Sequence, residues 1–538
     1  MAIGSPESDK RANWGPLVLS LGVGLAIRLI YFIGVSGHDD VDYFNYALDV
    51  LEGTFSTEPA SDGSFPFRFR IGMIFPTALM FRIFGPSEYA AAILPLLNSL
   101  GLIWLSWWGG SRISRGASLI APLLMATFPL AIGVSTSLLP GPFAAFFSGL
   151  SVLFWLSTED KHHHQQLTDL GANVRFYLAG VCLGLGYFYR IEVGLFVSFF
   201  VGFSVLHGRA WQGCLLAMAG AACVVILENL VYLGLHGEIL YRLKVVSGGF
   251  AGLSHELSET VLAKKSPMVY LKLIFLKPTD LGLHWAALFM ASIACLFYRA
   301  KERTPFLLWF WPVALYLFFG SWSVTSYVPT SKDPRYLISV TAPGLVLLAA
   351  LADKLRHQSP FWRNATHAGL AGTMLGSMLL MNLVFAYRSE NASSSRLASG
   401  FVMQHEAANP ESANEPIWCE HHAALALRCL LPHREIRAVT SHNLSISQTT
   451  IEIQPEEIDT GLVVVDHFVI DKYVTYSDMI APDFLLNPPE SWTPIFEAPH
   501  PVDGIQYSVV RLLNHLLGGR LAGPGRSLKT DPVIVYEP

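Results

Sequence analysis

Long apolar runs, separated by short polar segments, occupy most of the chain up to residue 387. A membrane-spanning helix needs about 20 predominantly apolar residues, and about eleven runs approach that length. They are 14–35, 89–108, 117–134, 142–156, 176–187, 193–206, 211–235, 283–298, 305–322, 336–352 and 368–387. The pattern predicts a polytopic α-helical membrane protein with about eleven spans. The runs 176–187 and 193–206 are either a broken pair or one long kinked helix.

Two other segments have a different pattern. Residues 71–84 are apolar but too short to span, so we expect an interfacial or re-entrant helix. After residue 387 the composition is that of a soluble protein, and helical or polar stretches such as 421–430 alternate with short apolar runs typical of strands. Those runs are 417–419, 436–440, 462–466, 507–512 and 533–535. We therefore expect a transmembrane domain over 1–387 and a soluble α/β domain over 388–538.

The overall composition agrees with a membrane protein. Hydrophobic residues make up 52% of the chain and charged residues only 14%, whereas soluble proteins carry about 25% charged residues. The net charge of −5 gives no basis for a nucleic-acid partner. Six cysteines in 538 residues do not form a disulfide scaffold. Cys419 and Cys429, both in the soluble domain, form either a disulfide or two buried thiols.

Basic residues in the short loops indicate the orientation. Lys and Arg are enriched in cytoplasmic loops, and those of this chain fall on one side when the runs are counted as spans. They are Lys10, Arg11, Arg112, Arg115, Lys161, Arg175, Arg209, Arg299, Lys301, Arg303, Lys354, Arg356 and Arg363. We expect an integral protein of the cytoplasmic (inner) membrane with a cytoplasmic N-terminus. The loops 36–88 and 236–282 and the soluble domain would then be extracytoplasmic.

Two of the expected outward loops are nevertheless basic. The first contains Arg68 and Arg70, and the loop 236–282 contains six further cations. These six are Arg242, Lys244, Lys264, Lys265, Lys272 and Lys277. Such clusters at a membrane surface suit a phosphate group. Alternatively they are ordinary solvated charges, because long loops cross the membrane regardless of charge.

The first outward loop also contains an acidic cluster. His38 is followed by Asp39, Asp40, Val41 and Asp42 at the point where the chain leaves the first span. Carboxylates packed together near a low-dielectric region raise one another's pKa, which suits a general base or a metal site. Asp40 also has a purely structural interpretation, as the N-cap of a helix that begins near residue 43.

The segment Lys332-Asp333-Pro334-Arg335-Tyr336 directly precedes a late span. Pro334 keeps Asp333 out of the helical conformation. Arg335 then lies at a helix start, where the helix dipole does not favour a cation. We expect Arg335 to bind an anion, either a phosphate or a carboxylate, unless its side chain extends to the lipid headgroups.

Other ionisable residues lie within or between spans. Arg190 lies between two short apolar runs, where it either binds an anion or pairs with Glu192. Arg28 and Glu228 lie inside spans, and ionisable residues at such positions face the interior of the bundle. A structural role for Arg28 and Glu228 is at least as well supported as a catalytic one.

Taken together, these motifs resemble those of the GT-C membrane glycosyltransferases. The nearest branch is that of the bacterial protein O-mannosyltransferase-like proteins and the lipid A aminoarabinose transferases. The acidic residues and the helix after them at 39–47 resemble the family's first outward loop, and 72–85 with Pro76 resembles its re-entrant helix. Arg335, Tyr336 and Pro343 resemble its late Arg-Tyr motif. The resemblance covers about residues 12–390, a range well beyond a single motif.

The resemblance implies a GT-C fold and inverting transfer of a sugar from a polyprenyl-phosphate donor to a glycan, lipid or protein on the outer face. Asp39 would be the catalytic carboxylate that deprotonates or orients the acceptor, and Asp40 lies next to it. Asp42 and His38 would support these two catalytic residues. Arg335 and Arg190 would bind the donor phosphate, and Lys264, Lys265 and Arg70 are further candidates. Lys332 and Tyr336 would support them. Many relatives have an Asp where this chain has Gly141.

Alternatives remain open. No cofactor is required by the pattern, although a divalent cation held by Asp39, Asp40 or His255 would fit the chemistry. A transporter or flippase of a lipid-linked or anionic substrate is the main alternative function. Transporters often contain inverted repeats and polar groups at mid-membrane, whereas the notable charges here gather at one surface. A non-catalytic lipid-binding or assembly protein is a third reading.

Overall fold

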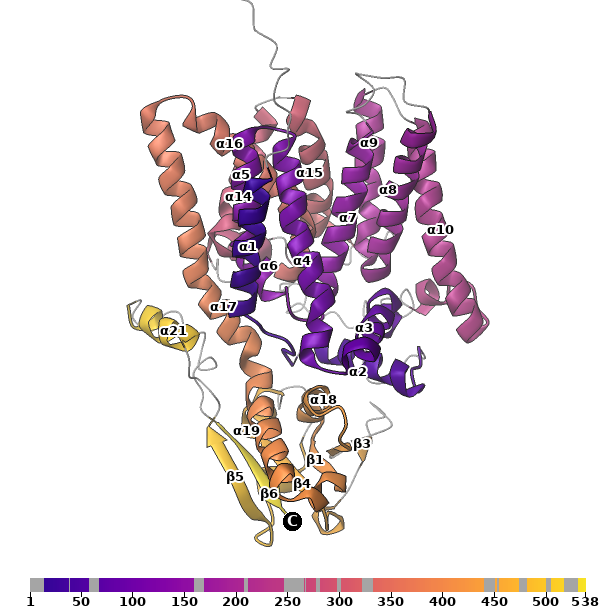
Figure 1. Cartoon of the computed structure of the whole chain (residues 1–538), viewed down its shortest axis with the longest axis vertical. Coiled ribbons are helices and arrows are strands. Elements are labelled where there is room, and N and C mark those ends of the chain that lie inside the picture. Colours follow the sequence, from indigo (N-terminus) through magenta and orange to yellow (C-terminus); the bar gives the residue numbers. More distant parts are fainter. Residues whose placement is uncertain are drawn as a thin grey trace, which may run out of the picture.

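The computed structural model describes residues 14–37, 39–57, 67–158, 169–207, 211–245, 266, 268–276, 281–297, 301–321, 332–439, 450–451, 454–473, 481–499, 505–516 and 531–538. These residues form a helical bundle and a smaller α/β domain, which lie at opposite ends of the long axis of the molecule (Figure 1). The chain is therefore a polytopic helical protein with a C-terminal sheet, as the hydropathy pattern predicts.

Helices lie at every apolar run, although not always with the predicted limits. The run 14–35 extends beyond the end of its helix, the run 117–134 is divided between two helices, and the runs 193–206 and 336–352 begin as 3₁₀ helices. The helices of the bundle are α1 (Gly15–Ile30), α4 (Glu88–Ser111), α5 (Arg115–Ala126), α6 (Pro129–Gly133), α7 (Pro140–Leu156), α8 (Asp169–Tyr189), α9 (Val197–His207), α10 (Trp211–His236), α13 (Met268–Phe275), α14 (Gly282–Phe297), α15 (Thr304–Phe319), α16 (Thr341–Arg356) and α17 (Pro360–Ala408). Four stretches among the described residues are long and apolar enough to cross a membrane: Glu88–Ser111, Trp211–His236, Pro334–Arg356 and Pro360–Ala386. Most of the others are apolar helices of 10–17 residues.

The apolar region 176–206 is a broken pair of helices. α8 ends at Tyr189, a 3₁₀ helix η3 follows over Ile191–Phe196, and α9 then begins. Arg190 lies at the break in an extended conformation. The break therefore places a basic residue at the end of a helix rather than within a continuous span.

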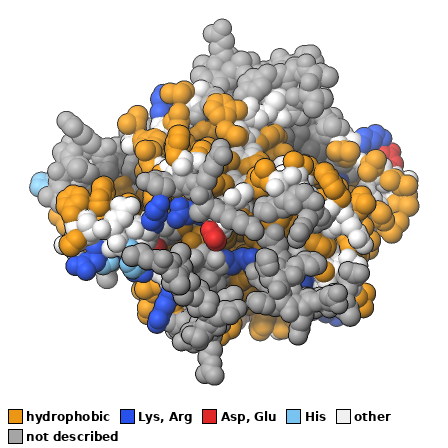
Figure 2. All heavy atoms as spheres, turned by 90° about the horizontal axis from the view of Figure 1, so that it is seen from above, with side chains coloured by type: hydrophobic (Ala, Val, Ile, Leu, Met, Phe, Trp, Pro, Cys, Tyr) orange, Lys and Arg blue, Asp and Glu red, His pale blue; other side chains and the backbone are white. Residues whose placement is uncertain are grey.

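Short helices cover the end of the bundle nearest the α/β domain. α2 (Asp39–Glu52), the 3₁₀ helix η1 (Phe67–Phe69) and α3 (Ile71–Phe84) follow the first span, and α2 and α3 lie across this end (Figure 1). The helix α3 has the bounds predicted for an interfacial or re-entrant helix. In the view onto the opposite end of the bundle, Lys and Arg side chains of the described residues are scattered among hydrophobic ones (Figure 2).

The α/β domain contains a six-stranded sheet with the order β3-β2-β1-β4-β6-β5. The four neighbouring strands β3, β2, β1 and β4 run parallel to one another. The strand β6 lies between β4 and β5 and is antiparallel to both. The strands are β1 (Ile417–Glu420), β2 (Ile436–Val439), β3 (Thr450–Ile451), β4 (Leu462–Asp466), β5 (Thr493–Pro499) and β6 (Pro532–Glu537). The helices are α18 (His421–Leu430), α19 (His467–Tyr473), α20 (Asp483–Leu486) and α21 (Ile505–Leu516). In the central strands Ile417 lies opposite Ile436 and Leu462, and continuous apolar runs of this kind are typical of buried parallel strands.

One predicted element of this domain is wrong. Residues 507–512 form part of the helix α21, not a strand. Tyr507 and Val510 are buried together, and their spacing of three residues is that of a helix face rather than of a strand. The predicted strands at 417–419, 436–440, 462–466 and 533–535 correspond to β1, β2, β4 and β6.

The helix α17 connects the two parts of the molecule without a linker. It runs from the bundle into the α/β domain, where Ala398 and Val402 pack with Ile417 of the sheet. The predicted domain limit at 387/388 therefore falls inside a continuous helix. Cys419 and Cys429 are both buried free thiols, which agrees with the second of the two interpretations given above.

Candidate active site

The helix α2 sets the positions of the acidic cluster. The Asp39 side chain is 31% exposed, whereas Asp40 is buried and accepts hydrogen bonds from the backbone N–H (2.5 Å) and hydroxyl (2.6 Å) of Ser36. Burial, with a contribution from the nearby carboxylates of Asp40 and Asp42, raises the pKa of the Cys429 thiol. Asp40 and Asp42 thus lie near Cys429 of the α/β domain, whereas Asp39 faces Arg335. Residues one apart point in different directions on a helix.

Asp39 forms an ion pair with Arg335. Arg335 belongs to the 3₁₀ helix η5 (Pro334–Val340), and its Nη1 lies 3.1 Å from the Asp39 carboxylate. Asp333 caps η5 by accepting the backbone N–H of Arg335 at 2.7 Å, and it also accepts the Arg335 Nε–H at 2.7 Å. The guanidinium thus links two carboxylates in a fixed orientation, because its donors form a rigid planar fork.

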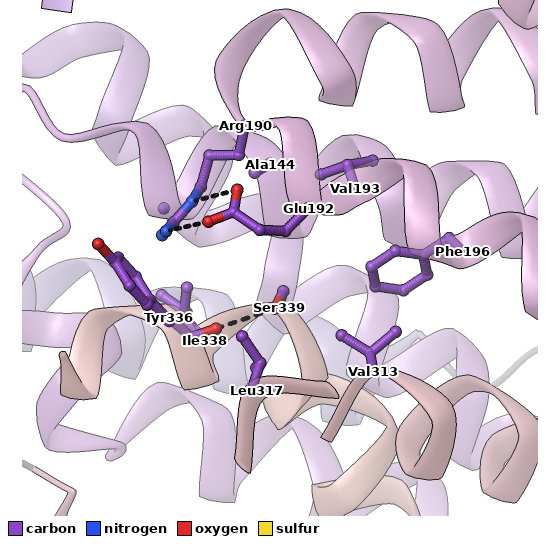
Figure 3. Close-up of a pocket in the computed structure, with 11 residues that line it drawn as sticks. Ala144, Arg190, Glu192, Val193, Phe196, Val313, Leu317, Tyr336, Ile338 and Ser339 are labelled. Atoms are coloured by element: carbon purple, nitrogen blue, oxygen red, sulfur yellow. Dashed lines mark hydrogen bonds and ion pairs between the residues drawn. The ribbon is translucent and has the colours of Figure 1, made fainter. Parts of the chain in front are cut away.

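Arg190 lies against the same region from the break between α8 and η3. Its guanidinium pairs with Glu192 at 3.1 Å and stacks over the ring of Tyr336 at 3.8 Å (Figure 3). Of the two alternatives for Arg190, the pairing with Glu192 is therefore present. Both side chains are largely buried, with 10% and 16% exposure. Cation–π stacking on Tyr336 holds the guanidinium plane.

Arg70 completes a group of three arginines. It precedes α3, its guanidinium donates a hydrogen bond to the Tyr43 hydroxyl, and it lies over the rings of Tyr43 and Phe67. Arg70 is close enough to Arg190 to be repelled by its charge and close enough to Asp39 to be attracted by its carboxylate. The site thus collects one carboxylate from α2 and arginines from three other elements of the chain.

A pocket opens beside Arg190. Its cavity volume is about 20 Å³, and it is lined by Glu192, Tyr336 and apolar side chains, among which Figure 3 shows Val193, Phe196, Val313 and Leu317. Gly141 also lines it, and a Cβ there would lie 3.3 Å from Ile338 Cγ2. The pocket therefore has a charged part, formed by Arg190 and Glu192, and an apolar wall. Glu192 is the acidic residue among the side chains that line the pocket.

Of the other predicted residues, Lys332 lies at the edge of this site, because Leu317, its hydrogen-bond acceptor, also lines the pocket. Lys332 donates to the Leu317 carbonyl at 2.6 Å and lies 5.6 Å from the centre of the Tyr270 ring, and burial lowers its pKa to about 8. Arg242 pairs with Glu228 in a buried contact. The candidates His38, Lys264, Lys265 and His255 lie outside the described residues.

The described residues do not form a metal-ligand set. Within the described part of the chain, three or more His, Cys, Asp or Glu side chains do not gather as metal ligands would. Asp39 is engaged by Arg335, and Asp40 by Ser36. The metal candidates Asp39 and Asp40 are therefore held by protein groups.

Two contributors to the site were not assigned from the sequence. Asp333 orients Arg335, and Tyr43 holds Arg70. An Asp directly before Pro at a helix start is a capping signal, so the capping role of Asp333 could have been predicted from the sequence. The contact of Tyr43 with Arg70 depends on how α2 packs against η1, and the sequence carries no comparable signal for it.

Solved structures of similar fold exist, although no protein-family model and no curated protein matches the chain. The ArnT of Cupriavidus metallidurans is 13% identical with a TM-score of 0.54, both in its apo state and bound to undecaprenyl phosphate. The apo structure covers 86% of this chain and 94% of that one, and the bound structure 87% and 96%. The Archaeoglobus fulgidus oligosaccharyltransferase tethered to an acceptor peptide is 13% identical with a TM-score of 0.52, covering 86% of this chain and 70% of that one. The chain therefore shares the polytopic fold of these proteins, in agreement with the GT-C-like fold expected from its motifs.

Proposed function

We propose that this protein is a glycosyltransferase that moves a sugar from a polyprenyl-phosphate donor to an acceptor hydroxyl or amide. The observation that carries the proposal is the ion pair between Asp39 and Arg335, with Arg190 and Arg70 beside it. A group-transfer site of this kind needs a base for the nucleophile and cations for the leaving phosphate. The similar ArnT structure bound to undecaprenyl phosphate supports a lipid-linked donor.

The arginines would hold the donor phosphate. Guanidinium groups bind phosphate oxygens through two parallel hydrogen bonds. Arg335 and Arg190 are already oriented, by Asp333 and by the ring of Tyr336 respectively. The apolar wall of the pocket beside Arg190 would contact the first part of the polyprenyl chain.

Asp39 would act on the acceptor. Its carboxylate would take the proton of the acceptor group as the acceptor oxygen or nitrogen bonds to the anomeric carbon. The bond between that carbon and the phosphate oxygen would break at the same time, so that polyprenyl phosphate leaves with both electrons of the bond. Attack opposite the leaving group inverts the anomeric centre. Arg335, Arg190 and Arg70 would stabilise the negative charge on the leaving phosphate.

Glu192 would supply a second carboxylate. Gly141 and Glu192 line the same pocket, so an acidic side chain is present there although residue 141 has none. We propose that Glu192 pairs with Arg190 until the donor phosphate displaces it. The shape of this pocket would determine which sugar and which acceptor the protein uses.

The site would face the extracytoplasmic side. The end of the bundle away from the α/β domain carries scattered Lys and Arg (Figure 2), including Arg112, Arg175 and Arg356 near ends of α4, α8 and α16. Basic residues favour the cytoplasmic side. This supports an inner-membrane protein with a cytoplasmic N-terminus and an extracytoplasmic C-terminal domain. A cysteine introduced at position 450 should react with an impermeant reagent in intact cells, and reaction only after lysis would contradict this orientation.

The activity can be tested with the full chain in proteoliposomes. A radiolabelled polyprenyl-phosphate sugar is supplied with candidate glycan, lipid and peptide acceptors, and labelled product is measured. We expect transfer by the wild type, loss of it in Asp39→Asn, and retention in Glu52→Gln, a matched change on the same helix. Full turnover by Asp39→Asn would refute the role of Asp39. Movement of the labelled lipid between leaflets without transfer would favour the transporter alternative.

A further inference from the structure

The helix α21 packs on α17 where the apolar span of α17 ends. Tyr507 and Val510 of α21 are buried against Leu383 and Ala386 of α17, and the apolar span Pro360–Ala386 ends at this contact. α21 lies beside α17 at the height of α3 and projects sideways from the molecule (Figure 1). The helix belongs to the α/β domain in sequence, yet it contacts the bundle at the boundary of its apolar layer.

A second apolar side of α21 faces away from this contact. Residues three or four apart share a side of a helix, which groups Val509, Leu512 and Leu513 separately from the residues that touch α17. Leu512 is 56% exposed. Ser508 and His515 are exposed on a third, polar side. α21 is therefore amphipathic even after its contact with α17 is taken into account.

The part of α17 that holds α21 faces lipid. Leu375, Leu379 and Leu383 follow one another at intervals of four residues and so lie on one side of α17. Leu375 is 69% exposed and Leu379 is 51% exposed, within a stretch long and apolar enough to cross a membrane. Since Leu383 continues this side and contacts α21, the helix α21 lies at the end of a lipid-facing surface rather than over the protein interior.

From this arrangement we infer that α21 is an interfacial anchor, whose Val509, Leu512 and Leu513 insert into the bilayer surface on the side of the α/β domain. The partner is the lipid surface itself. Amphipathic helices bind it by burying their apolar side at the boundary between headgroups and acyl chains. The anchor holds the α/β domain at a fixed height above the membrane, and this role does not depend on the proposed activity.

Spin-label accessibility tests the inference on the full chain in nanodiscs of phosphatidylethanolamine and phosphatidylglycerol. In a Cys223→Ser background, which removes the exposed native thiol, single nitroxides are attached at Leu512→Cys and at His515→Cys. Leu379→Cys serves as the lipid-facing reference and Glu411→Cys, on an exposed residue of the α/β domain, as the aqueous reference. Collision rates are measured with oxygen, which concentrates in the bilayer, and with a water-soluble nickel chelate.

We expect the ratio of oxygen to nickel collisions at position 512 to approach that at position 379 and to exceed the ratios at 515 and 411 severalfold. A ratio at position 512 equal to that at 411 would mean that α21 lies in water and would overturn the inference. An immobilised label at 512 that neither reagent reaches would mean that protein covers this side, and would also overturn it.

Discussion

The guanidinium of Arg335 lies 3.1 Å from the carboxylate of Asp39, although 296 residues separate them in the sequence. The same guanidinium binds Asp333, so that one arginine is shared by two carboxylates that are each about a quarter to a third exposed. An incoming phosphate would compete with both for the same donors. The pair therefore connects the proposed base to the proposed phosphate site.

Replacement of Arg335 by lysine should reduce sugar transfer by about 10²-fold, a typical cost of losing one group that stabilises the transition state. A lysine has a point charge and cannot bind Asp333 and Asp39 through a planar fork as arginine does. The rate of transfer by Arg335→Lys is measured in proteoliposomes, with Arg437→Lys in an exposed pair with Glu435 as the control. Wild-type turnover by Arg335→Lys would mean that the fork geometry is not used.

Replacement of Glu192 by glutamine should lower the KM for the donor. Glu192 occupies the Arg190 guanidinium at 3.1 Å, so its carboxylate competes with a bound phosphate. Removing that competition should lower the KM about fivefold, equivalent to about 1 kcal/mol, with little change in kcat. A large fall in kcat with an unchanged KM would instead assign Glu192 a role in the chemical step.

Most of the helical architecture could be predicted from the sequence because it depends on local hydrophobic pattern. The apolar runs on either side of Arg190 and the helix α3 are examples, since apolar runs and their interruptions are visible directly in the sequence. The pairing of Arg190 with Glu192 could also be predicted, because only one residue lies between them. Asp39 and Arg335 could each be singled out by charge, but their contact depends on the packing of the whole bundle.

Two other features could not be predicted from the sequence. A short apolar run such as 507–512 is compatible with a strand or a helix, and its burial against Leu383 and Ala386 decides for a helix. The change to a soluble composition after residue 387 predicts a domain limit there, but the chain forms one continuous helix across this point. It stays helical because Ala398 and Val402 pack against the sheet, which is a tertiary contact between segments far apart in the sequence.

Arg396 should be important for the stability of the junction between the two domains. It donates to the carbonyls of Ile33 (2.5 Å) and Val35 (2.8 Å) and pairs with Glu88 at 2.9 Å. Gly34, between the two carbonyls, has a φ of +63°, so this turn also depends on a glycine. Arg396→Gln removes the guanidinium that the two carbonyls and the Glu88 carboxylate share, and should lower the free energy of unfolding by about 1–3 kcal/mol.

The measurement is thermal or denaturant unfolding of the purified protein in detergent. Glu88→Gln and the double variant complete a double-mutant cycle, and we expect the double variant to be less destabilised than the sum of the two single ones. Strict additivity would show that the Arg396–Glu88 contact contributes nothing to stability.

The stability of the α/β domain should decrease as the pH rises from about 5 to about 7. Burial raises the pKa of Glu420 to about 7 and that of Asp466 to about 6. Because these pKa values lie above those of the unfolded chain, the folded protein binds the protons more tightly, and the free energy of unfolding falls as the protons are lost. For Glu420 the effect is about 3 kcal/mol between pH 4.5 and pH 7.

The check is the melting temperature of the domain across this pH range. Glu420 accepts the backbone N–H groups of His422 (2.8 Å) and Ala423 at the start of α18. A glutamine there keeps an acceptor but does not titrate, so Glu420→Gln should reduce the pH dependence to the part that Asp466 contributes. Glu415→Gln, at an exposed position before β1, should leave it unchanged. A wild-type melting temperature that rises towards pH 7 would contradict the raised pKa values, because it requires carboxyl groups whose pKa is lowered on folding.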